Sequence, residues 1–229
     1  MGRCSLPGVP RSPLMSGEVG SLARRSPSRP QQRGDRRRDE LLAAVERALA
    51  RRPLSALSIA EIARAAGTTR STFYFYFANK QAAVFALLQD IFFRQSVEAT
   101  AILQRDGDRL DNLAAALGQT VHGWRAHRSL MLAALEARAT DPEASASWDG
   151  WIDLYVAFLA GFIRDERTSG HAPAGPDEEL LARVLIAANE RMLERHLRAD
   201  QDEAAAIELH SALVHVWAKA IYYTPTKKV

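Results

Sequence analysis

The segment from Ser58 to Lys80 constrains the fold of this chain more than any other feature, because it carries the signals of two short helices joined by a glycine. Ser58-Ile-Ala-Glu61 is a capping box, in which the serine hydroxyl accepts from the Glu61 amide while the carboxylate returns to the Ser58 amide. Apolar residues then recur at helical spacing up to Gly67, and a second short helix is expected over about residues 69–76. Two helices of about eight residues around a glycine turn match a helix-turn-helix.

A helical period continues from Asp35 almost to the end of the chain. The alternating aromatic residues at 73–77 have the pattern of a strand, but the sequence offers no partner strand, so we expect a helix there. Glycine, proline and aspartate mark the breaks. The expected helices cover about 35–52, 59–66, 69–76, 79–104, 109–127, 129–139, 142–168, 177–198 and 202–223. The fold class is therefore all-α, with about nine helices: a three-helix head followed by a larger helical body.

Residues 1–34 are rich in proline, serine, glycine and arginine and have no periodicity, so we expect a disordered basic tail. Met15 is an alternative start of translation, which leaves open whether residues 1–14 belong to the natural protein. Residues 1–80 hold fifteen Lys and Arg against six Asp and Glu, whereas residues 81–229 hold fifteen against twenty-one. A basic first third suggests that this end meets a polyanion, the alternative being a solvated tail of no consequence.

The composition disfavours several other classes of protein. The single cysteine, Cys4, allows no disulfide framework or cysteine-rich metal site within one chain. No apolar run approaches the roughly 18 residues that cross a bilayer, and the N-terminus has no apolar signal region. We therefore expect a cytoplasmic protein, associated with the nucleoid and without a membrane segment.

Motifs of catalysis and metal binding are also missing from the sequence. It contains no G-x-S-x-G, H-E-x-x-H or P-loop motif. His122 and His127, like His210 and His215, are five residues apart, which is a poor spacing for a shared metal on one helix. We expect no enzymatic activity, no metal and no cofactor.

The second short helix has two different faces. Phe73 and Phe77 are four residues apart and point inward, whereas Thr69 to Thr72 and Tyr74 are hydrogen-bond donors on the other face that reach base edges or phosphates. Lys80 begins the next helix, where its charge and the helix N-terminal amides can both meet a phosphate.

Three arginines, Arg36 to Arg38, stand just before the apolar stripe of the first helix. Basic arms of this kind contact the DNA backbone or enter a neighbouring minor groove. The alternative is that these arginines only keep the tail soluble.

Residues 68–80, Thr-Thr-Arg-Ser-Thr-Phe-Tyr-Phe-Tyr-Phe-Ala-Asn-Lys, resemble the signature of the tetracycline-repressor family of regulators. In that family a glycine turn precedes a short recognition helix, a Tyr-x-Tyr-Phe stretch and a lysine at the start of the fourth helix. The resemblance implies base contacts from around Thr68, Thr69, Arg70 and Thr72, and phosphate contacts from Tyr74, Tyr76 and Lys80. A generic helical hairpin with buried aromatic residues is the alternative. The full set of candidate DNA-binding residues is Arg36, Arg37, Arg38, Ser58, Thr68, Thr69, Arg70, Ser71, Thr72, Tyr74, Tyr76 and Lys80.

The body is rich in aromatic residues, and those from Trp148 to Phe162 follow helical spacing on one stripe. Such a stripe is either ordinary core or the wall of a ligand pocket. Asn189 interrupts the apolar stripe of the eighth helix, and a buried asparagine needs a hydrogen-bond partner, either a ligand or a neighbouring group.

The body also resembles the ethionamide-response repressor branch of the family, on three pieces: Trp148 with Tyr155, Asn189-Glu-Arg191, and Leu213-Val-His-Val-Trp217 through Tyr222. That resemblance implies a long, narrow and mostly apolar pocket for a small effector. The implied wall residues are Leu113, Thr120, Trp124, Trp148, Tyr155, Phe158, Asn189 and Trp217. The branch has aromatic residues at the positions of Leu113 and Thr120, and an asparagine at Ile186, so we expect a differently shaped and less polar cavity.

In the family the last two helices pair across a two-fold axis, which implies a homodimer on a palindromic operator, with two dimers on longer operators. The apolar stripes expected to take part are Leu181, Val184, Leu185, Ala188 and Met192, and Leu213, Val216, Trp217, Ala220 and Ile221.

The chain is thus interpreted as a tail (1–34), a helix-turn-helix DNA-binding domain of the tetracycline-repressor type (35–95) and a helical ligand-binding and dimerisation domain (96–225). The expected function is a sequence-specific transcriptional regulator, a ligand-responsive repressor of double-stranded DNA operators. The alternatives are a non-specific DNA-coating protein, against which the single compact reading head argues, and a helical small-molecule-binding protein or enzyme.

Overall fold

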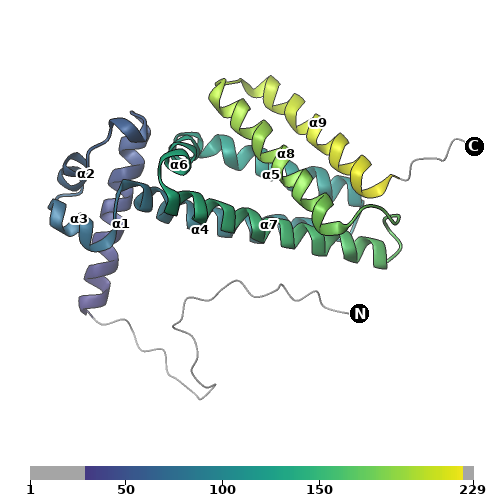
Figure 1. Ribbon diagram of the computed structural model, residues 1–229, viewed down its shortest axis with the longest axis horizontal. Coiled ribbons are helices and arrows are strands. Elements are labelled where there is room, and N and C mark those ends of the chain that lie inside the picture. The colour runs from purple at the N-terminus through teal and green to yellow at the C-terminus, as the bar shows by residue number, and fades with distance from the viewer. Residues whose placement is uncertain (1–28, 224–229) are drawn as a thin grey trace, which may run out of the picture. The chain divides into compact units, whose positions relative to one another are not determined.

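The computed structural model describes residues 29–223, and the side chains of 36–223, as helices joined by short turns (Figure 1). The elements are α1 (Arg29–Leu49), the 3-10 turn η1 (Leu54–Ala56), α2 (Ile59–Ala65), α3 (Arg70–Tyr76), α4 (Lys80–Leu103), α5 (Arg109–Ala126), α6 (Arg128–Thr140), α7 (Pro142–Thr168), α8 (Glu178–Arg198) and α9 (Glu203–Tyr222). None of the residues described forms a strand. The all-α fold class and the expected number of helices are confirmed.

Polar N-cap residues fix the starts of the helices in the body. Asp108, Asp141, Asp177 and Asp202 accept hydrogen bonds from first-turn amides of α5, α7, α8 and α9 respectively. These amides have no partner within the helix, so the carboxylate satisfies them. Because a cap is a local signal, these four helices begin within one residue of the positions predicted from the sequence.

The start of α1 differs from the prediction. The helix begins at Arg29 rather than near Asp35, so residues 29–34, which we predicted to be disordered, are helical. Pro30 lies in the first turn, where a missing amide costs no helical hydrogen bond. The rest of the predicted tail, residues 1–28, lies outside the described residues.

The chain divides into two compact units, residues 1–37 and 38–229. The second unit contains the head, in which Leu41, Val45, Ile62 and Phe73 of α1, α2 and α3 are buried. Gly67 has a φ of +63°, in the left-handed region that other residues avoid, and so turns the chain from α2 into α3.

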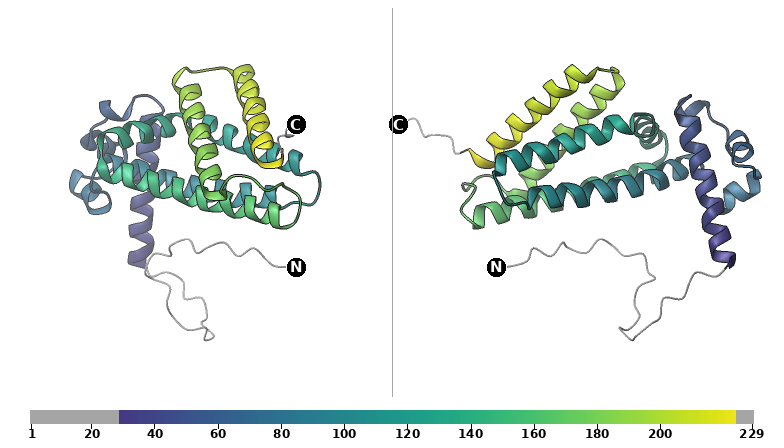
Figure 2. Two further views of the ribbon diagram at one scale, coloured as in Figure 1. Left: turned by 45° about the vertical axis from the view of Figure 1, so that its right-hand side comes forward. Right: turned by 180° about the vertical axis from the view of Figure 1, so that it is seen from behind.

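The body is a bundle in which α4 packs against α5, α5 against α9, α6 against α7 and α7 against α8 (Figure 2). The helix α6 also packs against η1, so it touches both the head and the bundle.

The last two helices have apolar residues on two sides, not on one. On α8, Leu185 is buried while Val184 and Met192 are exposed; on α9, Trp217 is buried while Val216 is exposed. The stripes predicted for a partner therefore mix core and surface residues. The reason is that each helix must also pack on its own bundle, and helical spacing alone does not separate the two faces.

Candidate DNA interface and ligand cavity

The residues predicted to read bases gather at the start of α3. Thr69 is the N-cap: its hydroxyl accepts from the Thr72 amide at 3.2 Å and lies 3.0 Å from the Thr72 hydroxyl. Arg70 and Ser71 are exposed and Thr68 is half-buried. The structure thus brings the five residues together, with two threonine hydroxyls partly engaged in capping.

The aromatic run that follows is divided between core and surface. Phe73 is fully buried and Phe77 nearly so, whereas Tyr74 is exposed and Tyr76 is half-buried. Phe75 was not among the predicted site residues, yet 80% of its surface is exposed. The signal that would have found it is the helical period, since a position two residues from Phe73 lies about 200° around the helix.

Lys80 does not present a free charge. Its Nζ donates to three backbone carbonyls around η1, those of Leu54 (2.7 Å), Ser55 (3.2 Å) and Leu57 (3.0 Å). An ammonium has three donors, and all three have partners here. The phosphate contact predicted for this side chain would require these bonds to break.

Ser58 forms the capping box that the sequence predicts. Its hydroxyl accepts from the Glu61 amide at 3.2 Å, and its own amide donates to the Glu61 carboxylate at 3.1 Å. The Ser58 amide, then the Ser58 hydroxyl and the charge of Arg52, lower the pKa of the Glu61 carboxyl below its ordinary value. Ser58 is exposed, but its hydroxyl is already in use.

The three N-terminal arginines differ in exposure. Arg36 and Arg37 are exposed, while Arg38 is half-buried, with its guanidinium carbon 5.7 Å from the centre of the Phe77 ring. Arg38 therefore packs on the head through a cation–π contact.

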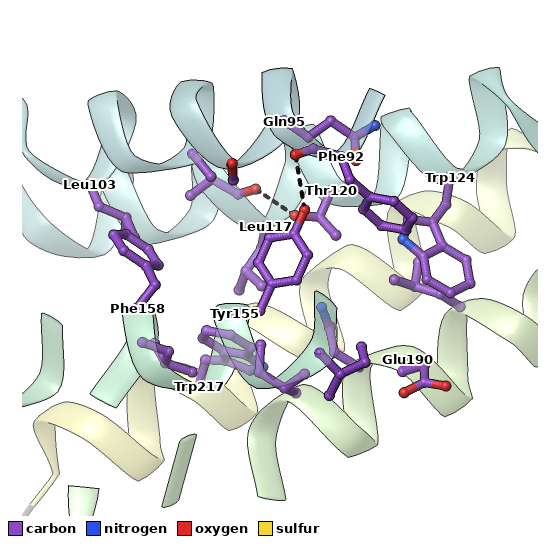
Figure 3. Close-up of a pocket in the computed structure, with 18 of the residues that line it drawn as sticks. Phe92, Gln95, Leu103, Leu117, Thr120, Trp124, Tyr155, Phe158, Glu190 and Trp217 are labelled. Carbon is purple, nitrogen blue, oxygen red and sulfur yellow. Dashed lines mark hydrogen bonds between the residues drawn. The ribbon is translucent and has the colours of Figure 1, made fainter. Parts of the chain in front are cut away.

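The body contains a cavity of about 110 Å³ among α4, α5, α7, α8 and α9 (Figure 3). All eight residues predicted for a pocket wall line this one cavity. The further lining residues are Phe92, Gln95, Ser96, Ala99, Leu103, Ala116, Leu117, Ile152, Leu159, Ile186, Glu190 and Leu193. Those on α4, such as Phe92, Ser96 and Leu103, follow one helical stripe, a signal that the sequence analysis did not use.

The hydroxyls in the wall donate to backbone carbonyls rather than into the cavity. Tyr155 donates to the Phe92 carbonyl at 3.2 Å, as Figure 3 shows, and Thr120 donates to the Ala116 carbonyl at 3.1 Å. Burial raises the pKa of Tyr155 above its ordinary value, so the phenol stays neutral. Asn189 is different: it is 7% exposed, and its Oδ1 has no hydrogen-bond partner in the part of the chain that the structure describes.

One side chain of the wall depends on a glycine. A Cβ built on Gly123 would lie only 2.1 Å from Gln95 Nε2, so the Gln95 amide rests directly on the bare backbone of α5. Any larger residue at Gly123 has to displace the amide.

The helix α6 joins the cavity wall to the head. On its cavity side Arg138 pairs with Glu190, which also accepts from Trp148 Nε1 at 3.2 Å. On its head side Glu136 accepts from the Ser55 amide at 2.7 Å.

At the end of α6 a second contact reaches the head. Asn79, the N-cap of α4, donates to Asp141, the N-cap of α7, at 2.9 Å. The starts of these two helices are therefore tied to one another.

An apolar surface remains on α8 and α9. Leu180, Val184 and Met192 of α8, and Ile207 and Val216 of α9, are all exposed in the single chain. Exposed apolar residues at helical spacing on two adjacent helices are typical of a surface that packs against another protein.

The described residues include neither a metal cluster nor a membrane span. Among the described residues no three His, Cys, Asp or Glu side chains stand close enough to hold a metal ion. Over the same residues, no helix has the length and apolar character to span a membrane.

Two sequence profiles match the chain. Residues 41–87 match the profile described as bacterial regulatory proteins, tetR family, and residues 113–223 match that of the C-terminal domain of transcriptional regulator EthR. The chain is 30% identical over 191 residues to the HTH-type transcriptional regulator EthR of Mycobacterium tuberculosis, covering 82% of this chain and 88% of the relative.

Solved structures share the fold at lower identity. The fatty acid degradation regulator FadR from Bacillus halodurans superposes with a TM-score of 0.65 at 19% identity, covering 78% of this chain and 94% of that one. FadR from Bacillus subtilis, solved in complex with stearoyl-CoA, gives a TM-score of 0.64 at 17% identity, covering 80% and 99%.

Proposed function

This chain belongs to the tetR family of bacterial regulatory proteins, in the branch of the EthR regulators, and on that premise we propose that it represses transcription from a palindromic operator, as a dimer, until an apolar effector binds. Proteins of this family are DNA-binding transcriptional regulators and not enzymes. The observation that carries the proposal is the set of contacts through α6 that joins an apolar cavity to a helix-turn-helix head.

The head, proposed as residues 35–95, reads DNA through the outward face of α3. Thr68 to Thr72 supply base contacts, and Tyr74 and Tyr76 supply phosphate contacts, because their hydroxyls and the Arg70 guanidinium stand on or beside the exposed side of the helix. Arg36 to Arg38 and Ser58 add contacts to the DNA backbone.

Lys80 contributes to DNA binding chiefly by holding the turn η1 in place. Its three hydrogen bonds hold the carbonyls of η1, the turn that leads into Ser58 and the capping box. We assign it to fixing that turn against the start of α4, so that α2 and α3 keep their places.

The dimer forms through the exposed apolar residues of α8 and α9, within the body proposed as residues 96–225. A two-fold axis at this surface places two recognition helices one turn of DNA apart, about 34–36 Å, and so demands a palindrome. Two dimers side by side then occupy a longer operator. The protein acts in the cytoplasm, on the nucleoid, where its operator is.

The effector is a small, mostly apolar molecule held in the cavity. Among the described residues no lysine, arginine or histidine lines the cavity, and the one charged lining residue, Glu190, is paired with Arg138. The stearoyl-CoA of the Bacillus subtilis neighbour supports a long acyl chain as one class of effector. Such a chain suits these walls, whereas the charged end of a coenzyme A would need to lie outside them.

The size of the cavity explains how effector binding is coupled to operator binding. Its volume of about 110 Å³ is below the roughly 300 Å³ at which ligand pockets begin, so an effector has to push the helices apart. Displacement of Trp148 and Glu190 moves Arg138 and with it α6, and α6 holds the head through Glu136. The effector weakens operator binding only by its difference in affinity for the two arrangements.

Two measurements on the full chain test this function. Genomic fragments bound by the purified protein are sequenced, and we expect a palindrome. Methyl laurate, the neutral methyl ester of a twelve-carbon acid, is then added: it should quench tryptophan fluorescence and release the palindrome in a gel-shift assay. Enrichment of no common sequence would contradict the operator, and binding of the ester without release would contradict the coupling for that ligand.

A matched variant separates binding from coupling. Glu136→Gln keeps every residue of the cavity but weakens the contact to the Ser55 amide. We expect unchanged ester binding and a smaller effect of the ester on operator affinity, whereas Thr140→Ala, on the same helix, should behave as the wild type.

A further inference from the structure

Phe75 is the most exposed of the large apolar side chains in the described part of the chain, at 80%. It is not a core residue that has been displaced, because Phe73 and Phe77 on either side of it fill the core of the head. A single exposed apolar side chain is ordinary on a protein surface, but Phe75 stands next to the exposed Tyr74 on the helix proposed to read DNA, which gives it a place to make contact.

The position of Phe75 on α3 is set by the helical period. It lies about 200° from the buried Phe73, and Ser71, four residues earlier, shares its face. Phe75 and Ser71 therefore stand at the middle of the outward side, flanked by Thr72 and Tyr74.

The ring of Phe75 lies near that of Tyr76, edge to face at a centroid distance of 4.9 Å and an interplanar angle of 87°, and is otherwise exposed. A phenylalanine has only two side-chain torsions, so ordering its ring on binding costs little conformational entropy.

In the major groove of DNA, only one kind of base offers an apolar group that the Phe75 ring could contact. The other outward side chains of α3 offer hydrogen bonds, which a phenylalanine cannot make. A recognition helix enters the major groove, and the only apolar group that base edges present there is the 5-methyl group of thymine. Apolar wedges that open base steps act from the minor groove instead.

We propose that Phe75 reads a thymine in each operator half-site by apolar contact with its 5-methyl group. The inference rests on the proposed function, because it requires α3 to lie in the major groove of an operator. It assigns sequence discrimination to a residue without a hydrogen-bonding group, at the part of the half-site that faces the C-terminal half of α3.

Replacing thymine by uracil tests this directly, since uracil pairs identically and lacks only the methyl group. In the palindrome recovered with the full chain, each thymine of the half-site is replaced in turn and affinity is measured by fluorescence anisotropy at fixed salt. We expect one position at which uracil weakens binding about fourfold in one half-site, and about fifteenfold in both, the value of one buried methyl group per site.

Two variants complete the experiment. Phe75→Ala should bind the thymine operator more weakly and lose the uracil penalty at that position, while keeping the circular dichroism and melting of the wild type. Phe93→Ala, which removes an exposed ring from α4, should leave both the affinity and the uracil penalty unchanged.

The outcomes separate the two claims. If no palindrome is recovered, the proposed function fails and the inference fails with it. If a palindrome is recovered and no thymine in it is sensitive to uracil, only the inference is overturned. A Phe75→Ala protein that keeps the uracil penalty also overturns it, because the methyl group is then read by another residue.

Discussion

The interiors of the head and the body of this regulator differ in how closely they are packed. In the head Leu41, Ile62 and Phe73 leave almost no surface exposed, and the capping box and the bonds of Lys80 satisfy the turns. The body instead keeps a cavity and an asparagine oxygen that has no partner among the described residues. A close-packed core resists deformation, whereas a cavity with an unsatisfied polar atom leaves free energy for a ligand to gain. The difference supports the proposed mechanism, in which the head moves as one piece and a ligand changes the shape of the body.

Truncation of a buried side chain in the head should give the largest decrease in the free energy of unfolding. Phe73→Ala removes a fully buried ring, and we expect the free energy of unfolding to fall by about 3–5 kcal/mol in urea denaturation. Phe75→Ala, two residues away and exposed, should change it by less than about 0.5 kcal/mol. Equal losses in the two variants would contradict the close packing assigned to the head.

Loss of the hydrogen bonds of Lys80 to the turn η1 should give the second-largest decrease in the free energy of unfolding. Lys80→Met keeps the length of the side chain but leaves three carbonyls without their charged donor, which should cost about 2 kcal/mol in the same measurement.

The salt dependence of operator binding separates the two roles considered for Lys80. If it positions η1, the variant binds more weakly with the same slope of log affinity against log salt. If it grips a phosphate, the slope falls by about one for each protomer, and the positioning role is wrong.

Two asparagines, Asn79 of the head and Asn189 of the body, allow the packing of the two regions to be compared through smaller changes in the free energy of unfolding. Asn79→Leu removes a helix cap and the bond to Asp141, which should lower the free energy of unfolding by about 1–2 kcal/mol. Asn189→Leu removes an amide whose oxygen has no partner in the described part of the chain, and should raise it by up to about 1 kcal/mol while weakening the response to the ester. Thermal unfolding of the two variants side by side tests this, and a marked destabilisation by Asn189→Leu would show that the amide is needed by the fold itself.

The smallest expected change in stability is that of a Glu61 variant, and it depends on pH. Its pKa in the folded protein lies below its ordinary value of 4.5, so its contribution is fully present above that value and is lost as the pH falls through the lowered pKa. The difference in melting temperature between the wild type and Glu61→Gln should therefore shrink between about pH 6 and about pH 3. A difference independent of pH would mean that the charge of the capping box contributes nothing.

The features predicted correctly are those that depend on a few neighbouring residues. The starts of α5 and α7, the capping box at Ser58 and the turn at Gly67 were predicted, and each is formed within about four residues of chain. Helix starts could therefore be located closely. The start of α1 was missed because no apolar stripe begins at Arg29.

The features that the sequence left undecided depend on distant segments. Lys80 bonds to carbonyls that lie 23 to 26 positions earlier, and no local pattern separates that role from a phosphate contact. The lining residues on α4 were overlooked because a helical stripe indicates burial but does not say whether the buried face meets core or cavity.

The sequence by itself determined that this protein is all-α, where most of its helices begin, and that residues 68–80 carry the signature of a DNA-reading head. The resemblance of its body to one branch of the family led to eight wall positions. Only the tertiary structure decided that these eight side chains meet around one cavity, that the oxygen of Asn189 has no partner among the described residues, that Lys80 is already bonded and that Phe75 faces outward. The physical reason is that helix formation and capping are satisfied within a few residues, whereas a cavity, a missing partner and an exposed ring are defined by which distant helices come together.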